Sequence, residues 1–310
     1  MRLRIAATVV VGLLALVLVN AFLVSRETRS AESFAGGRVI ELEGPDLNVR
    51  EYGPTGGDRA IVLLHGYSAS IEWWEQVAPA LAETSQRVVA IDLVGHGGSD
   101  APREDDEYGA AGQAQAVTRA LDALGVRRAV LVGHSMGGHV ATAIAEREPH
   151  VVERVAVVDT YGDKDLFDQP TLAQVGCWPI VGAVLDRFRG VDAMTESSLQ
   201  TGFDADFTVP DLAHRSLEQL THRGVCKSSA GDDLNDDRAV ADRLADLGKP
   251  VLVVWGSTDV LTPTDVNVAR YDSAGLSPVV IEGSGHSPMI EMPDEFLAAL
   301  TPFVAPGSAA

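Results

Sequence analysis

"VLVGHSMGGHV", residues 130–140, places one serine among glycines directly after an apolar run. A β-branched apolar run that ends in small residues is typical of a buried strand that turns into a helix. Residues 133–137 read G-x-S-x-G, the pattern that exposes a nucleophilic serine on a sharp strand-to-helix turn. The pattern therefore predicts that Ser135 is a nucleophile. A turn that merely contains a serine has the same letters, so the rest of the chain must decide.

Similar short apolar runs recur along the chain, and stretches of helical period lie between them. Near-continuous apolar strands that alternate with helices indicate a parallel sheet covered by helices on both faces. Because parallel strands end at one common edge, the residues that follow them are expected to converge there. These further runs cover residues 60–66, 87–93, 154–160, 250–259 and 278–286.

Residues 5–24 form an uncharged apolar stretch, with arginines before and after it. At about 1.5 Å per residue, a helix of this length spans roughly 30 Å, the thickness of the hydrocarbon core of a bilayer. We expect residues 1–30 to be an uncleaved membrane anchor, with the remaining chain outside the cytoplasm. A cleaved signal sequence ending near Ala21, which would give a secreted protein, and a buried core helix are the competing interpretations.

The composition excludes one class of partner. The chain of 310 residues carries 44 acidic and 24 basic side chains, a formal net charge of −20. A surface this acidic repels nucleic acid, so we expect no nucleic-acid binding. Oligomeric state cannot be inferred from these numbers. Cys177 and Cys226 match neither a zinc site nor a redox motif, and both a disulfide in an exported chain and two separate buried thiols remain open.

The apolar strand pattern stops between residues 161 and 237. We expect this segment to form a helical cap above Ser135, with Trp178 shaping an acyl pocket. The core is then expected in two parts, residues 31–160 and 238–310. Within the cap, the acidic stretch at residues 231–237 lacks the full spacing of a calcium loop and is interpreted as a solvated turn.

Three other features bear on Ser135. A His-Gly-Tyr turn at residues 65–67 ends an early strand, and it is placed to aim the backbone N–H of Tyr67 at an oxyanion, with the N–H of Met136 as the second donor. Asp259 and His286 each follow a later strand. A serine needs an imidazole base, and the imidazole needs a carboxylate to fix its tautomer.

The motifs "HGY", "DLVGHGGSD", "GHSMGG", "WGSTDVLTP" and "GSGHSPMIEMPDEF" occur in this order along the chain. With them, the chain resembles the α/β-hydrolase-fold serine hydrolases of the esterase and lipase type over about residues 40–305. The resemblance implies a mostly parallel, doubly wound sheet with a helical cap insertion. It also implies a catalytic triad of Ser135, Asp259 and His286, with the N–H groups of Tyr67 and Met136 as oxyanion hole. Some family members carry the acid after an earlier strand, and here Asp159 is that alternative.

The resemblance implies hydrolysis of an apolar carboxylic ester or lipid through an acyl-enzyme, with no cofactor and no metal. Serine at position 135 argues against haloalkane dehalogenases and epoxide hydrolases, which use aspartate there. Hydrolases of carbon–carbon bonds, cofactor-free haloperoxidases or perhydrolases, and a non-catalytic binding protein remain as alternatives. We interpret the other histidines and serines near the motifs as structural residues: His65, His96, His134, His139, Ser257, Ser284 and Ser287.

Overall fold

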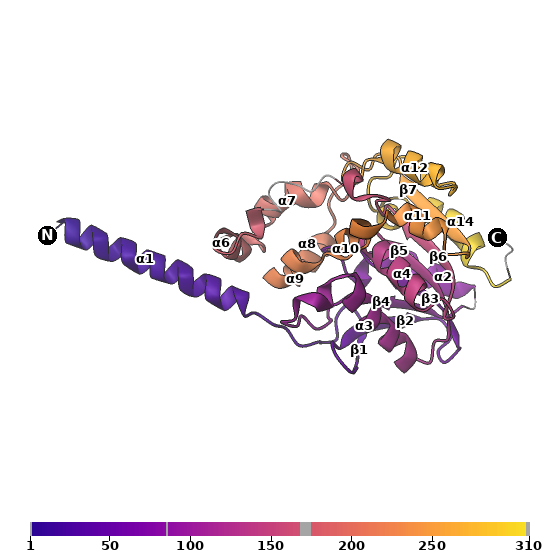
Figure 1. Cartoon of the computed structure of the whole chain (residues 1–310), viewed down its shortest axis with the longest axis horizontal. Helices are drawn as coiled ribbons and strands as arrows, with labels where there is room; N and C mark the ends of the chain where they lie inside the picture. The colour runs from indigo at the N-terminus through magenta and orange to yellow at the C-terminus, as the bar shows by residue number, and fades with distance from the viewer. Residues whose placement is uncertain (1, 85, 168–174, 308–310) are drawn as a thin grey trace.

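An eight-stranded sheet forms the centre of the computed structural model, which describes residues 2–84, 86–167 and 175–307. The strands lie in the order β1-β2-β4-β3-β5-β6-β7-β8. Figure 1 shows the sheet surrounded by helices. The neighbours from β4 to β8 pair in parallel, whereas β1 and β2 are antiparallel to their neighbours. The sheet is therefore mostly parallel, as the sequence predicted. The strands are β1 Arg38–Ile40, β2 Leu47–Tyr52, β3 Arg59–Leu64, β4 Val88–Ile91, β5 Arg128–His134, β6 Val152–Val158, β7 Val251–Gly256 and β8 Val279–Ile281.

Both faces of the sheet are covered, which makes the fold doubly wound. Alternate residues of β3 point to opposite sides, with Val62 and Leu64 in one apolar cluster and Ile61 and Leu63 in the other. Helices α3, α4, α11 and α12 contribute to the first cluster, and α2, α13 and α14 to the second. These helices are α2 Ala78–Glu83, α3 Ala110–Ala123, α4 Met136–Arg147, α11 Val240–Ala245, α12 Thr264–Ser273, α13 Pro288–Glu291 and α14 Pro293–Val304.

The long insertion between β6 and β7 is helical over the residues that the structure describes, and no strand lies there. We refer to residues 161–237 as the cap, although residues 168–174 lie outside the described part. Short 3₁₀ turns accompany the α-helices in the cap and the core. The cap helices are α6 Val181–Leu185, α7 Asp192–Gln200, α8 Asp211–Glu218, α9 His222–Lys227 and α10 Ala230–Asp237, and the 3₁₀ turns are η1 Ile71–Trp74, η2 Asp105–Tyr108, η3 Lys164–Leu166 and η4 Asp186–Phe188.

The interpretation of residues 231–237 as a solvated turn is wrong, because these residues belong to α10. Helix α10 packs against α3 and α4 and buries Leu234 and Asn235. Asp233 accepts a hydrogen bond of 2.9 Å from the backbone N–H of Ala110 at the start of α3. Asp233 thus caps α3, and Leu234 and Asn235 pack against the core, which are contacts that the local sequence does not show.

Helix α1, Arg2–Ser25, projects from the rest of the molecule (Figure 1). Its part from Arg4 to Ser25 is long and apolar enough to cross a membrane, and almost none of it is buried. The polar segment that follows α1 is hydrogen-bonded to the core. Arg29 pairs through its backbone with Ala101, and its guanidinium donates to the carbonyl oxygen of Ser99 at 2.8 Å. The base of α1 is therefore attached to the core.

Candidate active site

Ser135 occupies a strained turn between β5 and α4. Its φ of 50° and ψ of −118° are unusual for a residue other than glycine. The flanking glycines leave room for this turn, because a Cβ added at Gly133 would overlap the backbone of Gly137, and one added at Gly137 would overlap the carbonyl oxygen of Leu64. The G-x-S-x-G pattern is thus a steric requirement of the turn. The turn places Ser135 at the carboxyl edge of the sheet.

His286 and Asp259 form a buried hydrogen-bonded pair at the same edge. Nδ1 of His286 lies 2.7 Å from Oδ2 of Asp259, and both side chains are buried. Asp259 also accepts from the backbone N–H groups of Leu261 at 2.8 Å and Thr262 at 3.0 Å, and from the Thr262 hydroxyl at 2.5 Å. Burial works against the ionisation of Asp259, but the charge of His286 and these hydrogen bonds hold its pKa below the ordinary value.

A second buried carboxyl group, Asp159, lies beside this pair. Single oxygens of Asp159 and Asp259 and a nitrogen of His286 lie within 4.8 Å of one another. Oδ1 of Asp159 accepts from the backbone N–H of Gly256 at 2.9 Å, and Oδ2 has no hydrogen-bond partner among the described residues. Burial and then the negative charge of Asp259 raise the pKa of Asp159 well above its ordinary value. The two carboxyl groups therefore differ: their surroundings favour the ionised form of Asp259 and the protonated form of Asp159.

His134, directly before Ser135, holds the loop that carries His286. Its Nε2 donates to the backbone carbonyl oxygen of His286 at 2.7 Å, and the two rings lie 4.9 Å apart. Burial, followed by the charge of His286, lowers the pKa of His134 to about 3, so this imidazole is neutral. The strand that carries Ser135 is thus bonded to the loop that carries His286. His134 has the structural role that the sequence predicted.

The turn at residues 65–67 lies against Ser135. A Cβ added at Gly66 would come within 2.8 Å of Nδ1 of His134 and 3.1 Å of Cβ of Ser135, so the absence of a side chain at Gly66 lets the turn approach both residues closely. The ring of His65 is fully buried, donates from Nδ1 to the carbonyl oxygen of Gly66 at 2.7 Å, and accepts at Nε2 from the N–H of Leu93 at 3.0 Å. His65 is therefore a structural residue that shapes the turn before Tyr67.

The remaining histidines and serines of the motifs also make structural contacts. Nδ1 of His96 bonds to the carbonyl oxygen of Val94 at 3.1 Å, and Nε2 of His139 bonds to that of Tyr161 at 3.1 Å. Burial lowers the pKa of both imidazoles to about 4. Three serines bond to the backbone: Ser257 accepts from the N–H of Gly283, Ser284 donates to the carbonyl oxygen of Gly285, and Ser287 donates to that of Gly202.

Sequence reasoning missed Glu291, which bonds to the backbone on both sides of His286, the candidate base. Its carboxylate accepts from the N–H groups on either side of His286, at 3.0 Å from Gly285 and 2.9 Å from Ser287. It also accepts from the N–H of Asp204 in the cap at 2.7 Å. Glu291 lies inside the last quoted motif, but nothing in its sequence position shows that it bonds backwards to the loop. It joins the His286 loop to the base of the cap.

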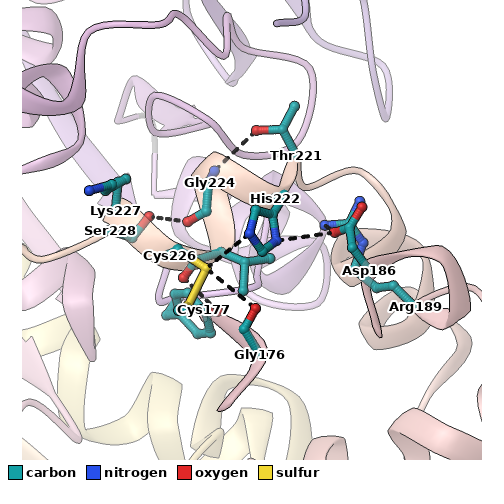
Figure 2. Close-up of a disulfide and its surroundings, with 12 residues drawn as sticks. Gly176, Cys177, Asp186, Arg189, Thr221, His222, Gly224, Cys226, Lys227 and Ser228 are labelled. Carbon is teal, nitrogen blue, oxygen red and sulfur yellow. Dashed lines mark hydrogen bonds and ion pairs between the residues drawn. A yellow bond between two sulfur atoms is a disulfide. The ribbon is translucent and has the colours of Figure 1, made fainter. Parts of the chain in front are cut away.

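The cap contains a disulfide bond between Cys177 and Cys226 (Figure 2). Of the two interpretations left open by the sequence, the structure therefore has the paired cysteines. Cys226 belongs to α9, and the carbonyl oxygen of the preceding residue, Val225, accepts from the Tyr67 hydroxyl at 3.0 Å. Trp178, expected to shape an acyl pocket, instead has 58% of its surface exposed. The disulfide thus links an exposed part of the cap to the helix that touches the turn at residues 65–67.

A family model described as alpha/beta hydrolase fold matches residues 59–293. The chain belongs to this family. The matched region contains the strained Ser135, the pair of Asp259 and His286, the neighbouring Asp159 and the turn at Tyr67. Family membership supports a hydrolase that acts on a small-molecule substrate.

Proteins that are similar to this α/β-hydrolase differ from one another in activity. A 2-hydroxy-6-oxononadienedioate/2-hydroxy-6-oxononatrienedioate hydrolase of Paraburkholderia phymatum is 30% identical over 245 residues, which cover 73% of this chain and 79% of that protein. The enol-lactonase structure of Burkholderia xenovorans has a TM-score of 0.72 at 24% identity and covers 86% of this chain and 99% of its own. The structure of a bacterial membrane phospholipase A has a TM-score of 0.65 at 24% identity, with 98% and 97% covered. The two structures show the shared fold.

Proposed function

We propose that this α/β-hydrolase is a serine esterase that cleaves an apolar carboxylic ester or lipid through an acyl-enzyme. The observation that carries the proposal is the buried 2.7 Å hydrogen bond between His286 and Asp259, at the sheet edge where Ser135 adopts its strained turn. An ionised Asp259 holds the proton of His286 on Nδ1, which leaves Nε2 unprotonated as a base. Ser135, Asp259 and His286 then have the three roles of a catalytic triad.

The proposed reaction has two halves. Nε2 of His286 takes the proton of the Ser135 hydroxyl as Oγ attacks the carbonyl carbon of the ester. The backbone N–H groups of Tyr67 and Met136 stabilise the oxyanion, and His286 then protonates the leaving alcohol. In the second half, His286 activates a water molecule that hydrolyses the acyl-enzyme and restores Ser135. All proton transfers run through His286, so the proposed steps require no cofactor and no metal.

Carbon–carbon bond hydrolysis of a dienoic ketoacid is the second candidate function. The relative from Paraburkholderia phymatum favours it, because its name states a ketoacid substrate and its match covers most of both chains. The same triad and oxyanion donors would serve both reactions, so the residues described above do not separate them. Substrate tests do: an esterase releases nitrophenol from nitrophenyl esters, whereas the alternative cleaves the ketoacid and leaves these esters almost untouched.

We also infer that α1 is a retained membrane anchor with the hydrolase domain outside the cytoplasm. Nδ2 of Asn20 donates to the carbonyl oxygen of Ala183 in α6 at 2.8 Å, a contact that cleavage after Ala21 would remove. The disulfide supports an oxidising compartment. The membrane phospholipase A structure, which is matched over 98% of this chain, adds a further likeness. The anchor predicts a mature chain that starts near Met1 and stays with membranes after an alkaline carbonate wash.

Labelling with a fluorophosphonate tests the enzyme proposal. We expect the probe to label the wild-type protein at Ser135, and Ser135→Ala to abolish labelling and lower nitrophenyl ester turnover by about 10³-fold or more. Ser257→Ala is the matched control, because Ser257 also follows a strand at this edge but lacks the strained turn. Its turnover should stay close to wild type. Retention of a tenth of the activity in Ser135→Ala would refute the assignment.

A further inference from the structure

Exposed apolar side chains gather in one stretch of the cap, between 43% and 58% exposed. The other exposed large apolar side chains of the described domain, such as Val260, Val266 and Val279, are scattered over the core. Scattered apolar residues on a surface are ordinary, but a contiguous group marks an interaction site. We call this group the apolar rim, and it consists of Trp178, Ile180, Val181, Phe188, Val191 and Met194.

The apolar rim lies beside the end of the apolar helix α1. Asn20 of α1 donates to the carbonyl oxygen of Ala183 in α6, and its own oxygen accepts from Nε of Arg187 at 2.8 Å. Arg223 of α9 donates to the carbonyl oxygen of Ser25, the last residue of α1, at 2.9 Å. Figure 1 shows α6 and α9 on the side of the domain from which α1 projects. Two helices of the cap are therefore attached to the end of the anchor.

These contacts set the depth of α6 relative to a membrane that α1 spans. Asn20 lies four residues before the end of the apolar stretch, about 6 Å along the helix axis. The last turn of a spanning helix lies where the hydrocarbon core meets the lipid headgroups. Helix α6, with the rim residues in it and next to it, is thus held near the level of this boundary.

The side chains and the charge of the apolar rim fit the boundary between hydrocarbon and headgroups. Tryptophan is enriched at membrane–water interfaces, where the ring contacts hydrocarbon and the N–H remains hydrated. The chain as a whole is strongly acidic, but residues 178–194, which contain the apolar rim, have two arginines and two aspartates, a formal net charge of zero. This stretch is therefore not repelled by anionic headgroups as the rest of the surface is.

From these observations we propose that the apolar rim inserts into the surface of the bilayer that α1 spans, and so holds the cap against the membrane. The proposal rests on the inferred anchor and adds a second, separate contact with lipid. For the proposed esterase, on which this part rests, such a contact favours an amphiphilic substrate that reaches the cap from the bilayer.

The rim is also connected to the candidate active site. Trp178 follows Cys177, which forms the disulfide with Cys226 (Figure 2). Cys226 follows Val225, whose carbonyl oxygen accepts the hydrogen bond from Tyr67. A few covalent bonds and one hydrogen bond thus join the rim to the proposed oxyanion turn. Insertion of the rim would fix the position of α9 over that turn. The membrane contact and the placement of the cap are expected to depend on each other.

Trp178 is a natural probe for insertion, because Trp73, Trp74 and Trp255 are buried in the core. The full-length protein is reconstituted in phosphatidylcholine vesicles with or without bromine on the acyl chains near the headgroup. We expect brominated lipid to quench part of the tryptophan emission, and aqueous iodide not to reach that part. Trp178→Phe should lack this component, while its remaining emission should be equal in both lipids.

The outcomes separate the rim from the anchor. Retention in the vesicles after a carbonate wash, with no bromine quenching and with Trp178 open to iodide, would overturn insertion of the rim alone. Retention with Trp178 shielded from both quenchers would show that protein, such as a second copy, covers the rim, and would also overturn the proposal. Release by the wash would overturn the anchor and this proposal with it.

A charge in the rim tests whether insertion matters for turnover. Phe188→Asp should lower hydrolysis of an ester embedded in vesicles about tenfold, because a carboxylate disfavours insertion, and should leave a water-soluble nitrophenyl ester within about twofold. Val266→Asp is the matched control, since Val266 is 47% exposed on the core helix α12 and should change neither rate. Equal losses of Phe188→Asp on both substrates would contradict a membrane-specific role.

Discussion

The carboxyl edge of the sheet and the cap hold their residues in different ways. At the sheet edge, Ser135, Asp259 and His286 follow rigid parallel strands, and their loops are joined by buried hydrogen bonds. The cap is built of short helices, carries a disulfide, and leaves a group of apolar side chains exposed. Catalytic side chains must be held at fixed distances and angles, and rigid strands supply that geometry. A surface that meets a lipid requires exposure, which the core of a soluble fold does not offer.

The comparison predicts that variants at the sheet edge affect chemistry most. Asp259→Asn should lower ester turnover by about 10³-fold or more, because the aspartate that fixes the tautomer of the histidine contributes up to about 10⁴ in serine proteases. Asp159→Asn should cost less than about tenfold, since its amide oxygen still accepts from Gly256 and its amide resembles the neutral carboxyl. Steady-state kinetics on one nitrophenyl ester, with circular dichroism as a control for folding, measures both. The reverse ranking would assign the acid to Asp159.

The disulfide should affect the cap more than the core. Its cysteines are 49 residues apart, and both lie in the cap. Closing such a loop stabilises a fold by about 4 kcal/mol in the chain-entropy model. Reduction, or the double change Cys177→Ser with Cys226→Ser, should therefore open the cap to limited proteolysis before the sheet unfolds. Mass analysis of the first cleavage sites checks the order. First cuts in the core would contradict the comparison, and two free thiols in the denatured, unreduced protein would exclude the bridge.

The smallest effect concerns stability against pH. The pKa of Asp159 is raised in the folded state, mainly by burial, so the folded chain binds a proton more tightly than the unfolded chain. Tighter proton binding stabilises the folded state at low pH. This stabilisation is lost as the pH rises from the pKa of Asp159 in the unfolded chain through its raised pKa in the folded chain. Asn at this position does not titrate. As the pH rises, the Tm of Asp159→Asn should therefore increase relative to the Tm of the wild type. A difference in Tm that stays constant from pH 5 to pH 8 would contradict a raised pKa of Asp159.

The sequence predicted the parts of the site that follow strands. Each apolar run marked a strand of the parallel sheet, and parallel strands end at one edge whatever their length. Ser135, Asp259 and His286 could be selected because each follows such a run. The contacts of Glu291 and the raised pKa of Asp159 could not be predicted, because both depend on hydrogen bonds and burial that only the folded loops create. The antiparallel strands β1 and β2 were missed: β1 is a three-residue edge strand, and β2 is buried only in its first half, so neither forms a continuous apolar run.

The sequence by itself determined the α/β-hydrolase fold, the strained turn at Ser135 and the apolar length of α1. These features depend on local patterns: hydrophobic period, glycine spacing and an uncharged run. Only the tertiary structure decided that Cys177 pairs with Cys226, that residues 231–237 form a helix, and that Asn20 joins α1 to the cap. Each of these depends on groups far apart in the chain, whose meeting is set by how the sheet and cap pack.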